Sequence, residues 1–458
     1  MGAMRAAVAA LAAGLLLVVS GCGSSGTTTS ANLGRDAAAL VPPDAIAFVS
    51  VDGNLNSDQW RRLDELTRGL QLRTRVLDQV HRALRQAQLD FNQDVRPAIG
   101  NELDVAVLGL EGGKPEAIVL AQPENVNKLR SLVAAYDQHA EGYRVEQVAD
   151  WSVVADSQEA FDKVRQAESG RSLAGVPWFQ DASDQVSGNA LARAYASGDA
   201  LRALPGAIGG LIRAGGSPRW VAARFAVEQG AVRLELHMGS PSPAPTPYSP
   251  QLLRDVPSGA VLAVSFKNLD RPLGRLAADP ALRGSLHQLE RYLGVPFARL
   301  APALAGEGAF YVLPGTLLPI FALEVVSPHP QSAARVLHTV VTRLRVKTWN
   351  IIPLRVARYG TRVVLTDAPT TLRTTGASLV DDQAYKDALA AAGVPDQVTF
   401  LAYADGQRLA PIIGAITQLL GRGAAPAQRP DLERLGAVVA FGARSGSNTR
   451  LVMRLGIR

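Results

Sequence analysis

The sequence predicts an α+β protein made of two tandem homologous domains, each a mostly antiparallel sheet with helices packed on one face. Two observations lead to this prediction. Short apolar runs joined by tight turns, which are typical of antiparallel strands, alternate with segments whose apolar residues recur at the helical period. In addition, blocks of the first half recur in the same order in the second half, about 205–215 residues later.

In the first half, the most regular helical pattern lies in residues 58–89, where apolar residues recur at intervals of three, four and seven. The clearest hairpin signal is the pair of apolar runs 104–110 and 116–121, which flank two glycines. The other predicted elements are strands at 45–51, 143–148, 151–156 and 189–196, helices at 125–139, 157–168 and 199–213, and a hairpin at 219–238.

The recurring blocks are mostly strand and turn patterns. The matched pairs include 41–51 with 256–266, 97–102 with 302–307, and 194–198 with 402–406. Between the two copies, residues 240–250 alternate proline with small residues, which favours an extended chain without a packed core. We therefore predict domains at 36–239 and 251–458, joined by a linker at 240–250.

The first residues are typical of an exported precursor, with a basic start, an uncharged apolar run and a small-residue cleavage site. Val19-Ser20-Gly21-Cys22 resembles the bacterial lipobox, which implies a signal peptide at 1–21 and fatty acylation of Cys22. Residues 22–35 would then form a flexible Gly/Ser/Thr tether. The alternatives are an ordinary cleaved signal peptide and an uncleaved anchor, although the apolar run is shorter than the roughly 20 residues that span a bilayer.

Three segments together resemble a family of exported bacterial proteins called domain of unknown function 3352. They are residues 41–52 (VPPDAIAFVSVD), 97–107 (PAIGNELDVAV) and 194–201 (AYASGDAL). The resemblance extends over nearly all of the chain after Cys22. It implies no catalytic residue, because the family has no known activity.

No sequence pattern indicates a catalytic, cofactor-binding or metal-binding residue. Nucleophile elbows, zinc-binding histidine pairs and phosphate-binding loops are absent from the sequence, and Cys22 is the single cysteine. Glu102 and Glu307 occupy equivalent places in the two copies. They would serve as an acid–base pair across the domains or, as we favour, hold a turn in each domain, since a fold-determining residue recurs in both copies.

Charge and hydropathy suggest few partners. The net charge is +6, without a dense basic cluster that would indicate nucleic acid binding. The arginines of 58–89 would lie on an anionic membrane or on a solvated helix face. Residues 309–323 carry no charge, and Leu317 and Leu318 at their turn would bind a partner or pack on the other domain.

We therefore expect a lipid-anchored protein on the extracytoplasmic face of the cell membrane. The first functional hypothesis is a non-enzymatic interaction or assembly module of the envelope. The second is a carrier of a lipid or other apolar ligand, which predicts a cavity of several hundred cubic ångströms. The third is a cell-wall polymer hydrolase that uses Glu102 or Glu307, and it fails if each glutamate bonds its own turn. Expected partners are the membrane, through the lipid on Cys22, and an envelope protein, a wall polymer or a lipid ligand.

Overall fold

The computed structural model describes residues 32–111, 114–136, 142–203, 216–240, 244–280, 282–315, 319–347, 353–368, 376–419 and 429–458. The chain divides into two compact units. Unit 1 contains Met1–Ala200 and Arg219–His237, and unit 2 contains Leu201–Pro218 and Met238–Arg458. Three residues singled out from the sequence, Cys22, Leu317 and Leu318, lie outside the described residues.

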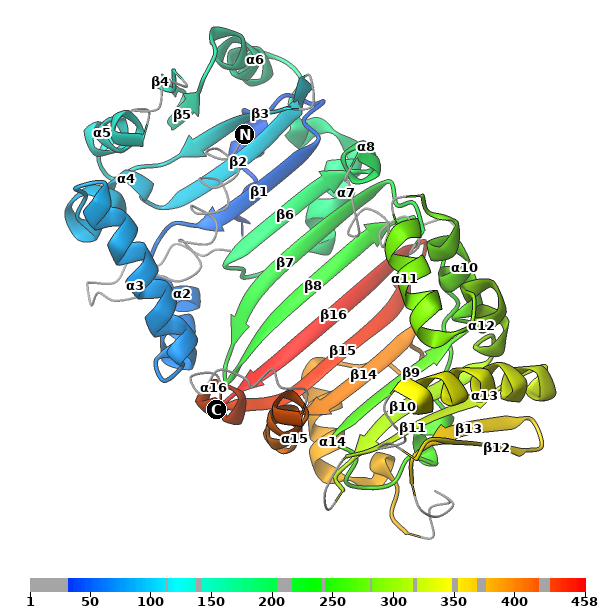
Figure 1. Ribbon diagram of the computed structural model, residues 1–458. Helices are drawn as coiled ribbons and strands as arrows, with labels where there is room; N and C mark the ends of the chain where they lie inside the picture. The colour runs from blue at the N-terminus through cyan, green and yellow to red at the C-terminus, as the bar shows by residue number, and fades with distance from the viewer. Residues whose placement is uncertain are drawn as a thin grey trace. The chain divides into compact units, whose positions relative to one another are not determined.

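Unit 1 is a mixed structure whose strands pair antiparallel, in the order β8-β7-β6-β1-β2-β3-β5-β4 (Figure 1). Its strands are β1 (Ala47–Asp52), β2 (Glu102–Glu111), β3 (Lys114–Ala121), β4 (Arg144–Val148), β5 (Trp151–Ala155), β6 (Ala192–Ser197), β7 (Trp220–Glu228) and β8 (Ala231–Gly239). Its helices are η2 (Ala37–Ala39), α2 (Asp58–Thr67), α3 (Gln71–Gln86), η3 (Phe91–Val95), α4 (Arg96–Ile99), α5 (Val126–Tyr136), α6 (Gln158–Ser169), η5 (Leu173–Gly175), α7 (Pro177–Gln185) and α8 (Gly198–Ala203).

Unit 2 has the same strand order as unit 1, namely β16-β15-β14-β9-β10-β11-β13-β12. Its strands are β9 (Leu262–Lys267), β10 (Glu307–Leu313), β11 (Ile320–Val326), β12 (Arg355–Tyr359), β13 (Arg362–Thr366), β14 (Phe400–Asp405), β15 (Leu435–Ser445) and β16 (Asn448–Ile457). Its helices are η6 (Leu252–Arg254), α10 (Asp270–Ala278), α11 (Arg283–Leu293), α12 (Phe297–Ala303), α13 (Pro330–Lys347), η7 (Leu379–Asp381), α14 (Gln383–Ala392), α15 (Gly406–Leu419) and α16 (Arg429–Glu433). The predicted class, helices with antiparallel sheet, is therefore confirmed.

The expectation that helices pack on one face of each sheet is wrong. In unit 1, Phe48 of β1 belongs to a core cluster with residues of α6 and α7, whereas Val51 of the same strand belongs to a second cluster with α2, α4 and α5. In unit 2, Ala322 and Leu323 of β11 likewise belong to different clusters. Successive side chains of a strand point to opposite faces, so both faces of each sheet are covered. The physical reason is that several strands are apolar at consecutive positions, as in β5, where every residue is buried.

The predicted helix at 58–89 is divided into α2 and α3. Gly69 lies between them, and glycine costs about 1 kcal/mol relative to alanine inside a helix. Only α2 contributes buried residues, among them Trp60, whose ring nitrogen donates to the carbonyl oxygen of Asp52 at 2.7 Å. The break therefore lets α2 pack on the sheet while α3 remains more exposed.

The ends of both predicted linkers pack on the units. Leu33 is buried in unit 1, near the end of the predicted tether. Tyr248, from the predicted proline-rich linker, is buried in unit 2 and exchanges two backbone hydrogen bonds with Val398. Both segments were predicted to lack a packed core because small residues and proline dominate them. Leu33 and Tyr248 are the large apolar side chains among these residues, and their burial offsets the cost of ordering the chain.

Candidate functional site

A pocket of about 390 Å³ lies in unit 1, over the face of the sheet that α7 covers. Its floor comes from β1, β6 and β7, and its walls come from α7, from residues 33–35 and from the turn after α7. The lining residues are Leu33, Gly34, Arg35, Phe48, Ser50, Ala174, Phe179, Gln180, Ala182, Ser183, Asp184, Val186, Ser187, Arg193, Ala194, Tyr195 and Ala222. This volume is within the range of small-molecule sites.

Three aromatic rings form one wall of the pocket. Phe48 of β1 and Tyr195 of β6 are directly opposite each other in the sheet. Phe179 of α7 contacts both rings edge-on, with ring centroids 5.9 Å from Phe48 and 5.1 Å from Tyr195. Each such pair contributes about 0.5–1.5 kcal/mol beyond its buried area, so this wall is well ordered.

A row of polar side chains crosses the same face of the sheet. It lies two residues along each strand from Phe48 and Tyr195. Asp104 of β2 is opposite Ser50 of β1, Ser50 is opposite Arg193 of β6, and Arg193 is opposite Arg224 of β7. Residues opposite each other in register share a face and lie about 5 Å apart. The pocket floor therefore has an apolar half and a charged half.

Arg193 connects two walls of the pocket. Its Nη1 donates to the carbonyl oxygen of Leu33 at 2.9 Å, and its Nη2 donates to that of Gly188 at 2.5 Å. Burial lowers the pKa of the Arg193 guanidinium; the charge of Arg224 lowers it further, that of Glu102 raises it, and that of Arg35 lowers it. Positive charge is thus concentrated at this end of the pocket.

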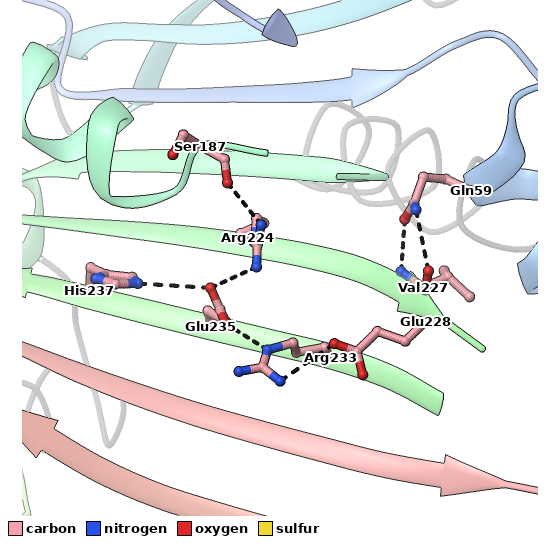
Figure 2. A network of polar contacts seen from close by, with 8 residues as sticks. All are labelled: Gln59, Ser187, Arg224, Val227, Glu228, Arg233, Glu235 and His237. Atoms are coloured by element: carbon pink, nitrogen blue, oxygen red, sulfur yellow. Dashed lines mark hydrogen bonds and ion pairs between the residues drawn. The ribbon is translucent and has the colours of Figure 1, made fainter. Parts of the chain in front are cut away.

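Arg224 belongs to a buried ion-pair network on β7 and β8 (Figure 2). Glu235, which is only 4% exposed, forms an ion pair with Arg224 Nη2 at 3.0 Å and accepts a hydrogen bond from Arg233 Nε at 2.6 Å. Arg224 Nη1 also donates to the carbonyl oxygen of Ser187, a pocket residue, at 2.8 Å. His237 Nε2 lies 4.0 Å from the carboxylate of Glu235. Glu235 therefore holds Arg224 beside the pocket.

The C-terminal end of β7 is also fixed to α2, as Figure 2 shows. The side chain of Gln59 donates to the carbonyl oxygen of Val227 at 3.2 Å and accepts from its amide at 2.8 Å. Both groups are buried, and a satisfied pair of this kind avoids the cost of two unpaired backbone groups.

Glu102 and Glu307 each bind a backbone amide in their own unit. Glu102 Oε1 accepts from the amide of Gly34 at 2.6 Å, and Glu307 Oε1 accepts from the amide of Leu252 at 2.7 Å. Gly34 has a φ of +80°, and a Cβ there would lie 2.2 Å from the hydroxyl of Ser50. The favoured structural interpretation of both glutamates agrees with these contacts, and Glu102 shapes the pocket by holding Gly34.

Three carboxyl groups lie close to this turn on β1 and β2. Burial raises the pKa of Asp52 to about 6 and that of Glu102 to about 7. Asp104 is fully buried, and burial, followed by the charge of Glu102, raises its pKa well above the usual range. The Asp104 carboxyl is therefore largely protonated in the folded protein near neutral pH.

The corresponding row in unit 2 keeps a serine but has apolar side chains in place of the carboxyl group and the two arginines. Ser265 of β9 is opposite Ala309 and Leu401, and Leu401 is opposite Phe441. The Ser265 hydroxyl forms a 2.9 Å hydrogen bond with the hydroxyl of the buried Tyr248. Unit 2 also has an edge-to-face contact that matches the one between Phe179 and Tyr195, formed by Tyr385 and Tyr403 at 5.0 Å. The two units thus share a framework and differ in the chemistry of this row.

Sequence reasoning missed the polar row, although the repeat contained a signal for it. The matched blocks place Ser50 with Ser265 and Glu102 with Glu307, and the same alignments place Asp104 with Ala309 and Arg193 with Leu401. A charged residue in one copy against an apolar residue in the other indicates a position whose role differs between copies.

Among the residues that the structure describes, no group of three or more histidine, cysteine, aspartate or glutamate side chains is arranged to hold a metal ion. Within the same residues, no helix has the length and apolar character needed to cross a membrane.

Comparison with known proteins identifies one family. The family described as "Protein of unknown function (DUF3352)" matches residues 2–151, which confirms the resemblance over that part of the chain. No curated protein matches the sequence. A solved structure described as "Structure of crystal form I of TP0453" is 8% identical, with 72% of this chain and 91% of that chain covered and a TM-score of 0.18. A likeness at that TM-score carries no argument about fold or function.

Proposed function

We propose that this chain is a lipid-anchored, non-enzymatic protein of the extracytoplasmic face of the cell membrane, and that unit 1 binds a small ligand with an apolar body. The observation that carries the proposal is the pocket of about 390 Å³ beside three aromatic rings. At the equivalent row, unit 2 has Leu401 and Phe441 instead of two arginines. The two units share a framework, but unit 1 has a pocket with charged residues where unit 2 has apolar side chains. This difference favours a binding role for unit 1.

The pocket favours the carrier hypothesis over a general assembly module, because the module predicts no cavity. The hydrolase hypothesis gains no support from Glu102 and Glu307, since each carboxylate accepts a backbone amide of its own unit. The anchor rests on the lipobox pattern that ends at Cys22.

The anchor predicts that Cys22→Ser moves the protein from the membrane fraction to the soluble fraction. The thiol is the attachment point for two acyl chains, and each buried methylene contributes about 0.8 kcal/mol to membrane binding. Fractionation of cells that produce the full chain, followed by immunoblotting, measures the distribution. Ser24→Ala is the control and is expected to remain with the membrane. A Cys22→Ser protein that also remains there contradicts the anchor.

The pocket predicts binding of the neutral fluorescent probe N-phenyl-1-naphthylamine to the chain from Gly23 onward. Ala222 lines the pocket opposite Tyr195, so we expect Ala222→Leu to fill the site and weaken binding about tenfold or more. Probe fluorescence during titration measures the affinity.

The matched control is Val439→Leu, because Val439 is opposite Tyr403 at the equivalent place in unit 2. It enlarges a buried side chain without touching the pocket, and probe binding is expected to stay unchanged. The carrier proposal fails if the unaltered chain does not bind the probe, or if both variants weaken binding equally.

A further inference from the structure

We infer that the ligand of the unit 1 pocket is a fatty-acid-like amphiphile whose single carboxylate sits between Arg35 and Arg193. This inference rests on the proposed function and adds the chemical class of the ligand. The geometry that points to it is the division of the pocket into an aromatic wall and an arginine-bearing end.

Arg193 stands at the charged end of the pocket. It lies directly opposite Arg224 on the neighbouring strand, and Arg224 is already paired with Glu235 at 3.0 Å. Hydrogen bonds to the carbonyl oxygens of Leu33 and Gly188 hold the Arg193 guanidinium in one orientation. A planar guanidinium that is held in place presents its donors in a geometry that suits a carboxylate. A ligand carboxylate here would offset the positive charge of Arg193.

The lining of the pocket is positively charged. Among the residues that line it, Arg35 and Arg193 contribute two positive charges and Asp184 contributes one negative charge, an excess that suits a monoanion. Glu102 does not line the pocket, although its charge also acts on Arg193. Arg35 lies 3.8 Å from Asp184, and both side chains are largely exposed. Exposed ion pairs of this kind contribute little to stability, so a ligand carboxylate can displace Asp184 from Arg35.

The apolar half of the pocket adjoins the charged half. The pair formed by Phe48 and Tyr195 lies on the same face of β1 and β6 as the pair formed by Ser50 and Arg193, two residues away along each strand. A ligand with its carboxylate at Arg193 therefore places its next carbon atoms against the aromatic wall. Neither half of the pocket by itself suits both ends of an amphiphile.

The experiment compares decanoate with decanol as competitors of N-phenyl-1-naphthylamine, at about pH 8, where a carboxylic acid is ionised. We expect decanoate to displace the probe at a concentration at least about tenfold lower than decanol, as a charge-assisted hydrogen bond warrants. Arg35→Gln is expected to remove most of that preference. Arg35 is chosen because Arg193 holds the pocket walls, so its replacement would also disturb the fold.

The control variant is Arg171→Gln, an exposed arginine of unit 1 that does not line the pocket and whose loss changes the net charge equally. It is expected to keep the preference for decanoate. The inference is overturned if the probe binds but decanoate and decanol compete equally, or if both arginine variants behave alike; the proposed function survives either result. Absence of binding for the probe and for decanoate, the latter measured directly by calorimetry, overturns both.

Discussion

Replacement of Glu235 by alanine is expected to lower the free energy of unfolding of unit 1 by about 3–5 kcal/mol, because it leaves two poorly exposed arginines without their shared carboxylate. Glu235 forms an ion pair with Arg224 at 3.0 Å and accepts a hydrogen bond from Arg233 at 2.6 Å, and it is almost completely buried. Removal of one partner from a buried ion pair costs much more than the pair itself contributes, since the remaining charge stays desolvated.

Hydrogen exchange of peptides from residues 220–237 is the suitable measurement, because two units need not unfold together. Glu159→Ala is the matched control. It removes a carboxylate that is 76% exposed and lies 3.0 Å from Lys163, so the expected loss is about 0–1 kcal/mol. If the Glu235→Ala protein loses no more stability than the control, the network in Figure 2 has no energetic importance.

Unit 1 is also expected to lose stability as the pH rises from about 4 to about 8. A carboxyl group whose pKa is raised on folding binds more protons in the folded state, so its contribution is complete at low pH and is lost as the pH rises through the folded value. Asp52 loses its contribution around a pKa of about 6 and Glu102 around about 7. For Asp52 the shift from 3.8 corresponds to roughly 3 kcal/mol.

Asp104→Asn tests this expectation, because an amide resembles the protonated carboxyl that burial favours at Asp104. The variant is expected to be more stable than the unaltered protein at about pH 8 and to depend less on pH. Denaturation of unit 1 over a series of pH values, followed by hydrogen exchange, gives the slope. Asp150→Asn, at an exposed turn, is the control and should change stability by no more than about 0.5 kcal/mol. An unchanged slope for Asp104→Asn contradicts the assignment.

Much of the fold follows from local patterns. The predicted hairpin at 104–110 and 116–121 corresponds to β2 and β3, and the runs 143–148 and 151–156 correspond to β4 and β5. Alternation and turn residues are local, so they are visible in one sequence. The placement of helices on both faces was not predicted, because a strand such as β5 with apolar residues on both sides does not show which helix covers which side.

The candidate site was predicted only in part. Glu102 and Glu307 were singled out because they recur, and both hold a turn. Arg193 and Arg224 were missed, because the strands β6 and β7 that bring them together are separated by more than 20 residues of chain. Register between strands depends on long-range pairing, and a shift of one residue would have put these arginines on the other face.

The class of fold and the lipobox pattern at Cys22 are visible in the amino-acid sequence, because each depends on residues close together in the chain. The recurrence of the strand blocks is visible there too, because each block is itself a short local pattern. Which side chains meet depends on the tertiary structure. Pairing of β2, β1, β6 and β7 aligned a carboxyl, a hydroxyl and two guanidinium groups across one face, and α7 enclosed the space beside them. The physical reason is that a pocket depends on volumes left between elements far apart in sequence, which no local pattern specifies.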